Sequence, residues 1–188
     1  MMPHRQQPSN FSRQLRGFTL IELILGIVTL AIALVLLTTL LYPQAFRSAE
    51  PVLQLRAANL GQALLDEVIA KSFDENSPRN GNLIRCGETG GPSCTLPAEL
   101  GPDGSETRAS FNDVDDFHQL QVTFPALSDA TGTNLAARYP GFGFRVNVCY
   151  SNTSGQCVGS ITPYKRVLIT TITPLGQELA ISVIKGNY

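Results

Sequence analysis

The sequence has little of what most enzyme active sites require. Only two of its 188 residues are histidines, His4 near the amino terminus and His118 in the middle of the chain. No GxSxG nucleophile motif and no glycine-rich phosphate-binding loop is present. With histidine this scarce, a Cys–His catalytic pair is not expected either. We therefore predict that the chain is not an enzyme and carries no cofactor.

An excess of basic residues is also missing. The chain has 14 Lys and Arg against 15 Asp and Glu, a net charge of −1. Three of the basic residues, Arg5, Arg13 and Arg16, lie in the first 17 residues, which contain no acid. Setting these three aside leaves 11 basic and 15 acidic side chains, a charge of −4. Because no basic stripe is available to displace counterions from phosphates, no nucleic-acid partner is expected.

Charge and proline are both absent from one long stretch. Leu23–Leu41 is an apolar run of nineteen residues. At about 1.5 Å per residue it is long enough to cross a hydrocarbon core of about 30 Å, which predicts one membrane span. The three arginines before it outnumber Arg47 and Arg56 in the fifteen residues after it. This bias predicts a cytoplasmic amino terminus and a periplasmic carboxyl-terminal part.

A single acid, Glu22, lies at the start of this apolar block. A carboxylate within a span costs on the order of 2.5–3.5 kcal/mol, so an acid there suggests a function and a partner. The alternative is a Glu at the membrane interface, favoured by the positive end of the helix dipole. A secretory signal would place a small-residue cleavage site after the apolar run. Residues 44–49 match such a site poorly.

Together with the residues before it, Glu22 completes the motif GFTLIE at residues 17–22, between a basic leader and an uncharged run. This arrangement resembles the processing site of type IV prepilins. The resemblance implies that a prepilin peptidase, which is also an N-methyltransferase, removes residues 1–17 by cutting between Gly17 and Phe18. It further implies that Phe18 becomes N-methylated. Glu22 would then form an ion pair with the new amino terminus of a neighbouring subunit during assembly.

Two helical segments are predicted after the leader. Residues 18–42 form an apolar half, and residues 43–73 form an amphipathic half. Pro43 and Pro51 predict kinks or a locally unwound segment between them. The second half has an apolar stripe, which predicts a helix face packed on a sheet. The stripe consists of Leu53, Ala57, Leu60, Leu64 and Val68.

Residues 74–188 are expected to form a periplasmic β-rich domain. Its first part, residues 74–110, is dense in Gly, Pro and Ser and predicts loop structure. Four cysteines allow three pairings. An oxidising periplasm and short loops favour two local disulfides, Cys86 with Cys94 and Cys149 with Cys157. A zinc site is the alternative, although paired zinc ligands are usually spaced by roughly two to four residues.

Three acids, Asp113, Asp115 and Asp116, lie within five positions. Such oxygen-rich clusters can hold calcium, as some pseudopilins do in a loop of their domain. The stretch lacks the Gly and the Glu that complete an EF-hand loop. We therefore expect a solvated acidic turn and no metal.

Alternating apolar residues predict strands in the rest of the chain. They cover Gln119–Phe124, Phe142–Tyr150, Arg166–Thr173 and Glu178–Lys185, with a hairpin turn at residues 174–176. A helix on one face of such a sheet gives a small α+β domain. The resemblance implies the type IV pilin fold, a long amino-terminal helix packed on an antiparallel sheet.

Three further stretches narrow the resemblance: ANLGQALLDEVIAKSFDE, NDVDDFHQL and KRVLITTITPLGQELAISVIKGNY. They are similar to minor pilins, in particular to D-type minor subunits of mannose-sensitive haemagglutinin (MSHA) pili. This implies a subunit that initiates, primes or tips a filament, with major and minor pilins and an inner-membrane assembly platform as partners. Such a protein is a single-pass inner-membrane protein before it enters the filament. Two alternatives stay open, a minor pseudopilin of a type II secretion or DNA-uptake system and a signal-anchored periplasmic enzyme or binding protein.

Overall fold

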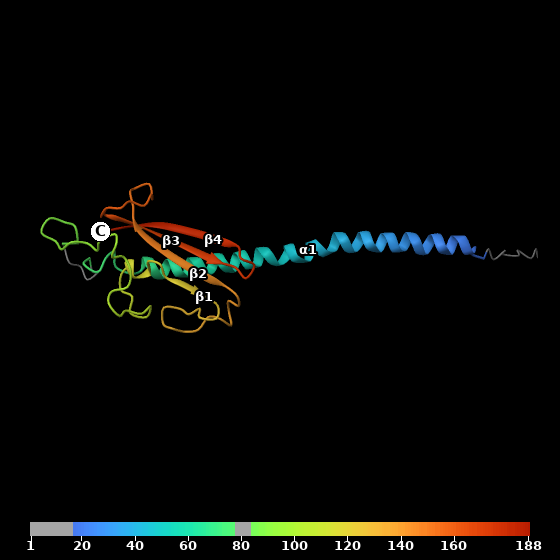
Figure 1. The fold of residues 1–188 in the computed structure, drawn as a ribbon, viewed down its shortest axis with the longest axis horizontal. Helices are drawn as coiled ribbons and strands as arrows, with labels where there is room; N and C mark the ends of the chain where they lie inside the picture. Colours follow the sequence, from blue (N-terminus) through green and yellow to red (C-terminus); the bar gives the residue numbers. More distant parts are fainter. Residues whose placement is uncertain (1–16, 78–83) are drawn as a thin grey trace, which may run out of the picture. The chain divides into compact units, whose positions relative to one another are not determined.

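The computed structural model describes residues 17–77 and 84–188, leaving out the side chains of residues 41–49. The chain divides into two compact units, Met1–Ser48 and Ala49–Tyr188. The elements are α1 (Leu20–Ile69), the short 3-10 helix η1 (Asp115–Phe117), and the strands β1 (Gln121–Thr123), β2 (Gly143–Tyr150), β3 (Tyr164–Ile172) and β4 (Glu178–Gly186). The predicted α+β class is confirmed (Figure 1).

In the first unit, Leu20–Leu40 is apolar enough, with a mean hydropathy of 2.9, to cross a membrane by length and composition. Its large apolar side chains are exposed. Its threonine hydroxyls do not need water, because each bonds a carbonyl one turn earlier. Thr29 donates to Leu25, Thr38 to Leu34 and Thr39 to Leu36, over 2.8–3.0 Å. The segment can therefore enter an apolar environment with these polar groups satisfied.

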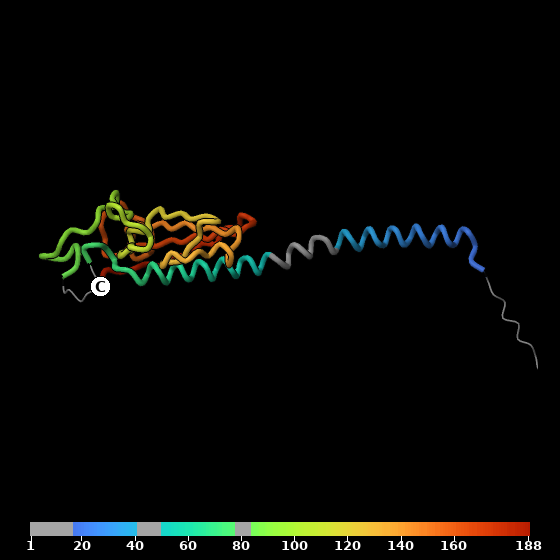
Figure 2. The backbone as a smooth tube through the Cα atoms, turned by 90° about the horizontal axis from the view of Figure 1, so that it is seen from below, coloured from blue at the N-terminus to red at the C-terminus, as the bar shows by residue number. Residues whose placement is uncertain are grey.

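The second unit contains the later part of α1, which lies along the domain (Figure 2). The predicted apolar stripe is confirmed, since Ala57, Leu60, Leu64 and Val68 are buried and Leu53 packs against the same core. The helix comes close to the sheet at Gly61. A Cβ added there would lie 3.0 Å from Ile181 Cδ1 and 3.4 Å from Thr171 Cγ2. The missing side chain therefore sets how closely α1 packs on β3 and β4.

The sheet is antiparallel throughout, in the order β1-β2-β3-β4. Side chains directly opposite each other on three strands form rows that face α1, and the rows are Val148–Val167–Val183, Val146–Ile169–Ile181 and Phe144–Thr171–Leu179. The turn between β3 and β4 is closed at Gly176, whose N–H donates to the Thr173 carbonyl. Gly176 has φ +76°, a backbone conformation that glycine adopts without a steric cost.

The four strands predicted from the sequence correspond to the four-stranded sheet of the described residues, but β1 is shorter than expected. It covers Gln121–Thr123 instead of Gln119–Phe124. Gln119 has φ +58°, which is not an extended conformation, and Pro125 supplies no N–H after Phe124. The expected unwound segment between Pro43 and Pro51 is wrong for the described backbone, because α1 is helical from Leu20 to Ile69.

Candidate functional site

The acid Glu22 occupies the first turn of α1. It is the only charged residue of the span segment Leu20–Leu40, and its side chain is exposed. The Thr19 carbonyl accepts hydrogen bonds from the N–H groups of Glu22 and Leu23, each over 3.1 Å. Thr19 thus directly precedes the helix, and Thr-x-x-Glu is the spacing of a capping box. The sequence interpretation did not consider this spacing, although Thr19 stands within the motif itself.

The expected cleavage point lies just before this turn. Phe18 is 83% exposed. A Cβ built on Gly17 would meet no atom within 4 Å. Nothing in the described surroundings of Gly17 therefore requires glycine there, and a need for it would come from another protein. Arg5, Arg13 and Arg16 of the predicted leader lie outside the described residues.

Both cysteine pairs lie at disulfide distance, in the predicted pairing. The Cα atoms of Cys86 and Cys94 are 4.8 Å apart, and those of Cys149 and Cys157 are 5.7 Å apart. The first pair is buried in a small cluster with Phe73 and Tyr150, while the second ties the end of β2 to the following loop. The zinc alternative is wrong for this structure, because disulfide sulfurs are not thiolate ligands.

The expectation of a solvated acidic turn is also wrong. Asp113, Asp115 and Asp116 are each only 2% exposed. Asp113 Oδ1 accepts hydrogen bonds from the N–H groups of Asp115 and Asp116, over 2.9 and 3.2 Å. Asp116 Oδ2 accepts from the N–H groups of Asn112 and Asp113. These two carboxylates therefore hold η1 and the turn before it through backbone groups, as local caps do.

The third acid of the turn, Asp115, has a distant partner. Its Oδ1 lies 2.6 Å from Lys165 Nζ, and the Lys165 side chain is fully buried. The same Nζ lies 2.9 Å from Asp74 Oδ2. Burial raises the pKa of the Asp115 carboxyl above its ordinary value, although the Lys165 charge opposes this. Nζ thus links the loop after α1, η1 and the start of β3.

The sequence interpretation found neither Lys165 nor Asp74. One signal was present for Lys165, because it alternates with Val167 and Ile169 and so belongs to the inner face of β3. The strand predicted from the sequence began at Arg166 and so excluded Lys165, whereas β3 begins at Tyr164. His118, the other polar residue noted beside the acidic turn, has its Nδ1 3.2 Å from the N–H of Val148. This contact attaches the segment after η1 to β2.

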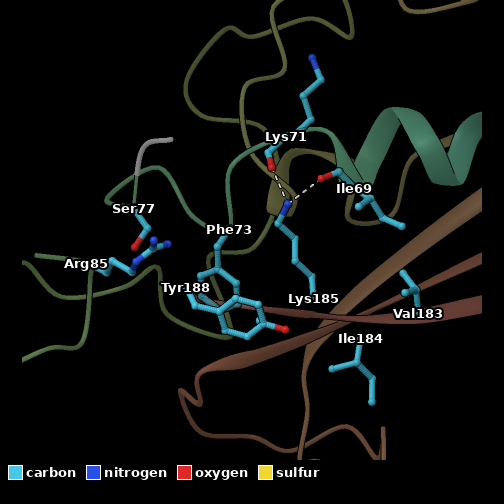
Figure 3. Close-up of a pocket in the computed structure, with 10 residues that line it drawn as sticks. Ile69, Lys71, Phe73, Ser77, Arg85, Val183, Ile184, Lys185 and Tyr188 are labelled. Atoms are coloured by element: carbon cyan, nitrogen blue, oxygen red, sulfur yellow. Dashed lines mark hydrogen bonds between the residues drawn. The ribbon is translucent and has the colours of Figure 1, made fainter. Parts of the chain in front are cut away.

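A cavity of about 270 Å³ lies where α1 ends, and Figure 3 shows the residues that line it. Lys185 Nζ donates there to the carbonyl oxygens of Ile69 and Lys71. The last carbonyls of a helix lack partners within the helix, so a lysine beside them acts as a cap. Phe73 and Tyr188 line the same cavity. We assign this cavity a structural role at the helix end.

Comparisons of the chain with protein-family models, with curated proteins and with solved structures find no match.

Proposed function

We propose that the chain is a minor pilin of a type IV pilus of the MSHA kind, which enters the filament through its amino-terminal helix and initiates, primes or tips it. In this proposal the domain adopts the type IV pilin fold. The observation that carries the proposal is Glu22, the only charged side chain in Leu20–Leu40, at the first turn of a helix whose large apolar side chains are exposed. An apolar surface this long needs lipid or other helices to cover it.

The sequence GFTLIE joins this acid to a cleavage point. Prepilin peptidase would cut between Gly17 and Phe18 and methylate Phe18. The free space around Gly17 supports recognition by another protein, because no described residue packs where a larger side chain would lie. Before assembly the protein would be a single-pass inner-membrane protein with its domain in the periplasm. Its partners would then be the assembly platform and the other pilins.

Glu22 would act by pairing with the methylated amino terminus of a neighbouring subunit. Alone in lipid the carboxylate is costly, and the pair compensates its charge. Breaking a buried ion pair by removing one partner costs about 3–5 kcal/mol, enough to select the register in which subunits join.

The proposal is tested by the mass of the amino-terminal peptide of the membrane-extracted protein, from cells with and without prepilin peptidase. We expect a chain that begins at N-methylated Phe18 only when the peptidase is present. The variant Gly17→Val should keep its leader and still fold, because a larger side chain meets open space. A wild-type chain that keeps its leader, or is cut after the apolar run, would overturn the proposal.

A further inference from the structure

Lys165 lies at the start of β3 with its side chain entirely enclosed. Its Nζ contacts three oxygens: Asp115 Oδ1 at 2.6 Å, Asp74 Oδ2 at 2.9 Å and the Phe73 carbonyl at 2.8 Å. These three acceptors match the three N–H donors of an ammonium group. The amine is therefore held in one position, against a carboxyl that is 50 residues away in the sequence.

Aromatic rings close the site around this amine. The ring centroids of Phe73 and Tyr150 lie 4.5 and 5.0 Å from Nζ. Both rings are buried, and the Tyr150 hydroxyl donates to the Thr95 carbonyl over 2.7 Å. Burial also raises the pKa of the Asp115 carboxyl, which favours its protonated form. Transfer of a proton from Lys165 to Asp115 gives a neutral amine beside a neutral acid, and these are the forms that condense.

The other carboxylate, Asp74, is held in place independently of the lysine. Asp74 Oδ1 accepts from the N–H of Asn76, and Oδ2 accepts from the N–H of Thr95, each over 3.0 Å. The Tyr150 hydroxyl lies 3.3 Å from the same Oδ2. Asp74 is thus positioned to take a proton from Nζ.

We propose that Lys165 and Asp115 join in an intramolecular isopeptide bond, formed by the chain itself. The Lys165 nitrogen bonds to Cγ of Asp115, and one Cγ–O bond of that carboxyl breaks. Asp74 takes a proton from the nitrogen and passes it to the leaving hydroxyl, which departs as water. One amide and one water form from the ammonium and the carboxylate, and no electrons, metal or other reactant are required. Well-oriented intramolecular reactions reach effective molarities on the order of 10⁵–10⁸ M.

The bond would fasten η1 to β3 and close a covalent loop from residue 115 to residue 165. The loop contains β1 and β2. A cross-link of this kind lowers the entropy of the unfolded chain, as a disulfide does, and unlike a disulfide it survives reduction.

The test is the mass of the full-length chain, extracted from membranes, denatured and fully reduced. We expect it to be lighter than its sequence by one water, after allowance for any processed terminus. A digest should then contain a branched peptide that joins Lys165 to Asp115. Recovery of the two residues only in separate linear peptides would overturn the proposal. A branch from Lys165 to Asp74 would overturn the assignment of Asp115.

Variants distinguish the proposed isopeptide bond from other reactions that lower the mass by one water. Lys165→Arg keeps a cation but should show the full, unbranched mass. Lys185→Arg is the matched control on the neighbouring strand, because Lys185 donates to backbone carbonyls of Ile69 and Lys71, and it should keep the loss of water. A loss of water that persists in Lys165→Arg would contradict the proposal. The branched peptide of the wild-type chain decides the matter even if the arginine variant does not fold.

Discussion

Asp113 is a buried carboxyl whose near neighbours are also acids. Burial, reinforced by the charges of Asp115 and Asp116, raises its pKa from the ordinary value of 3.8 to about 8. The folded chain therefore keeps a proton that the unfolded chain releases once the pH exceeds about 4. Because the folded state binds more protons across this window, the free energy of unfolding falls as the pH rises from about 4 to about 8.

The variant Asp113→Asn should remove most of this dependence. Asn keeps the oxygen that accepts from the N–H groups of Asp115 and Asp116, and it has no charge to bury. We expect a flatter stability profile between pH 4 and 8. The gain at pH 8 should be on the order of 5 kcal/mol, because each of the roughly four pKa units corresponds to about 1.4 kcal/mol. The free energy of unfolding at each pH is measured by tyrosine fluorescence during denaturant unfolding of the detergent-extracted chain.

The control for this prediction is Asp129→Asn. Hydrogen bonds from Thr131 and Thr133 lower the pKa of the exposed Asp129 carboxyl, so it is ionised in both states above about pH 5. Its replacement should leave the slope between pH 5 and 8 unchanged. An unchanged slope in Asp113→Asn would show that Asp113 does not hold the extra proton.

At the scale of the element, α1 of the second unit presents one apolar face to the sheet. Leu64 on that face is 3% exposed, and Leu55 on the same helix is 63% exposed. Leu64→Ala should destabilise the domain by about 2–5 kcal/mol, because it leaves a cavity in the core. Leu55→Ala should change stability by no more than about 0.5 kcal/mol. Equal losses, measured by unfolding of the full chain in detergent, would contradict the packing described here.

The two disulfides form a second matched pair of elements. Each joins cysteines eight positions apart, so loop closure contributes equally to both, about 2–3 kcal/mol. Cys86 and Cys94 are also buried against Phe73 and Tyr150. Replacing this pair by serine should therefore cost about 1–2 kcal/mol more than replacing Cys149 and Cys157, because buried hydroxyls are penalised. Denaturant unfolding of the two double variants makes the comparison, and an equal loss would contradict it.

Periodicity predicted these elements because it depends on neighbours in the sequence. The stripe through Leu60 and Leu64 repeats with the helix, and the alternation in β2 and β3 repeats with the pleat. The contacts of the buried Lys165 follow no such repeat, because its partners are distant in the sequence. Lys165 meets Asp115 and Asp74, which are 50 and 91 residues away. From the sequence alone the cluster of acids therefore suggested a solvated turn. Only the folded chain brings Lys165 to these acids and buries them.

At the scale of the whole molecule, the chain combines an exposed apolar helix segment with a domain that has its own core. Under the proposed function this segment moves from lipid to a filament. Its one acid then has two possible uses, to complete a capping box at the Thr-x-x-Glu spacing with Thr19 or to pair with a neighbouring amino terminus. The two uses make different demands on the side chain.

Substitutions at Glu22 distinguish them. Glutamine at the third position of a helix still completes a capping box, whereas alanine does not, and neither carries a charge. If pairing is the function, Glu22→Gln and Glu22→Ala should both be processed at Gly17 and remain in the membrane, yet be missing from sheared filaments. Immunoblots of sheared and membrane fractions, with the processed mass as the control, measure this. Normal incorporation of Glu22→Gln beside failure of Glu22→Ala would assign the acid to the cap, and the register of assembly would then have to come from the apolar surface of the helix.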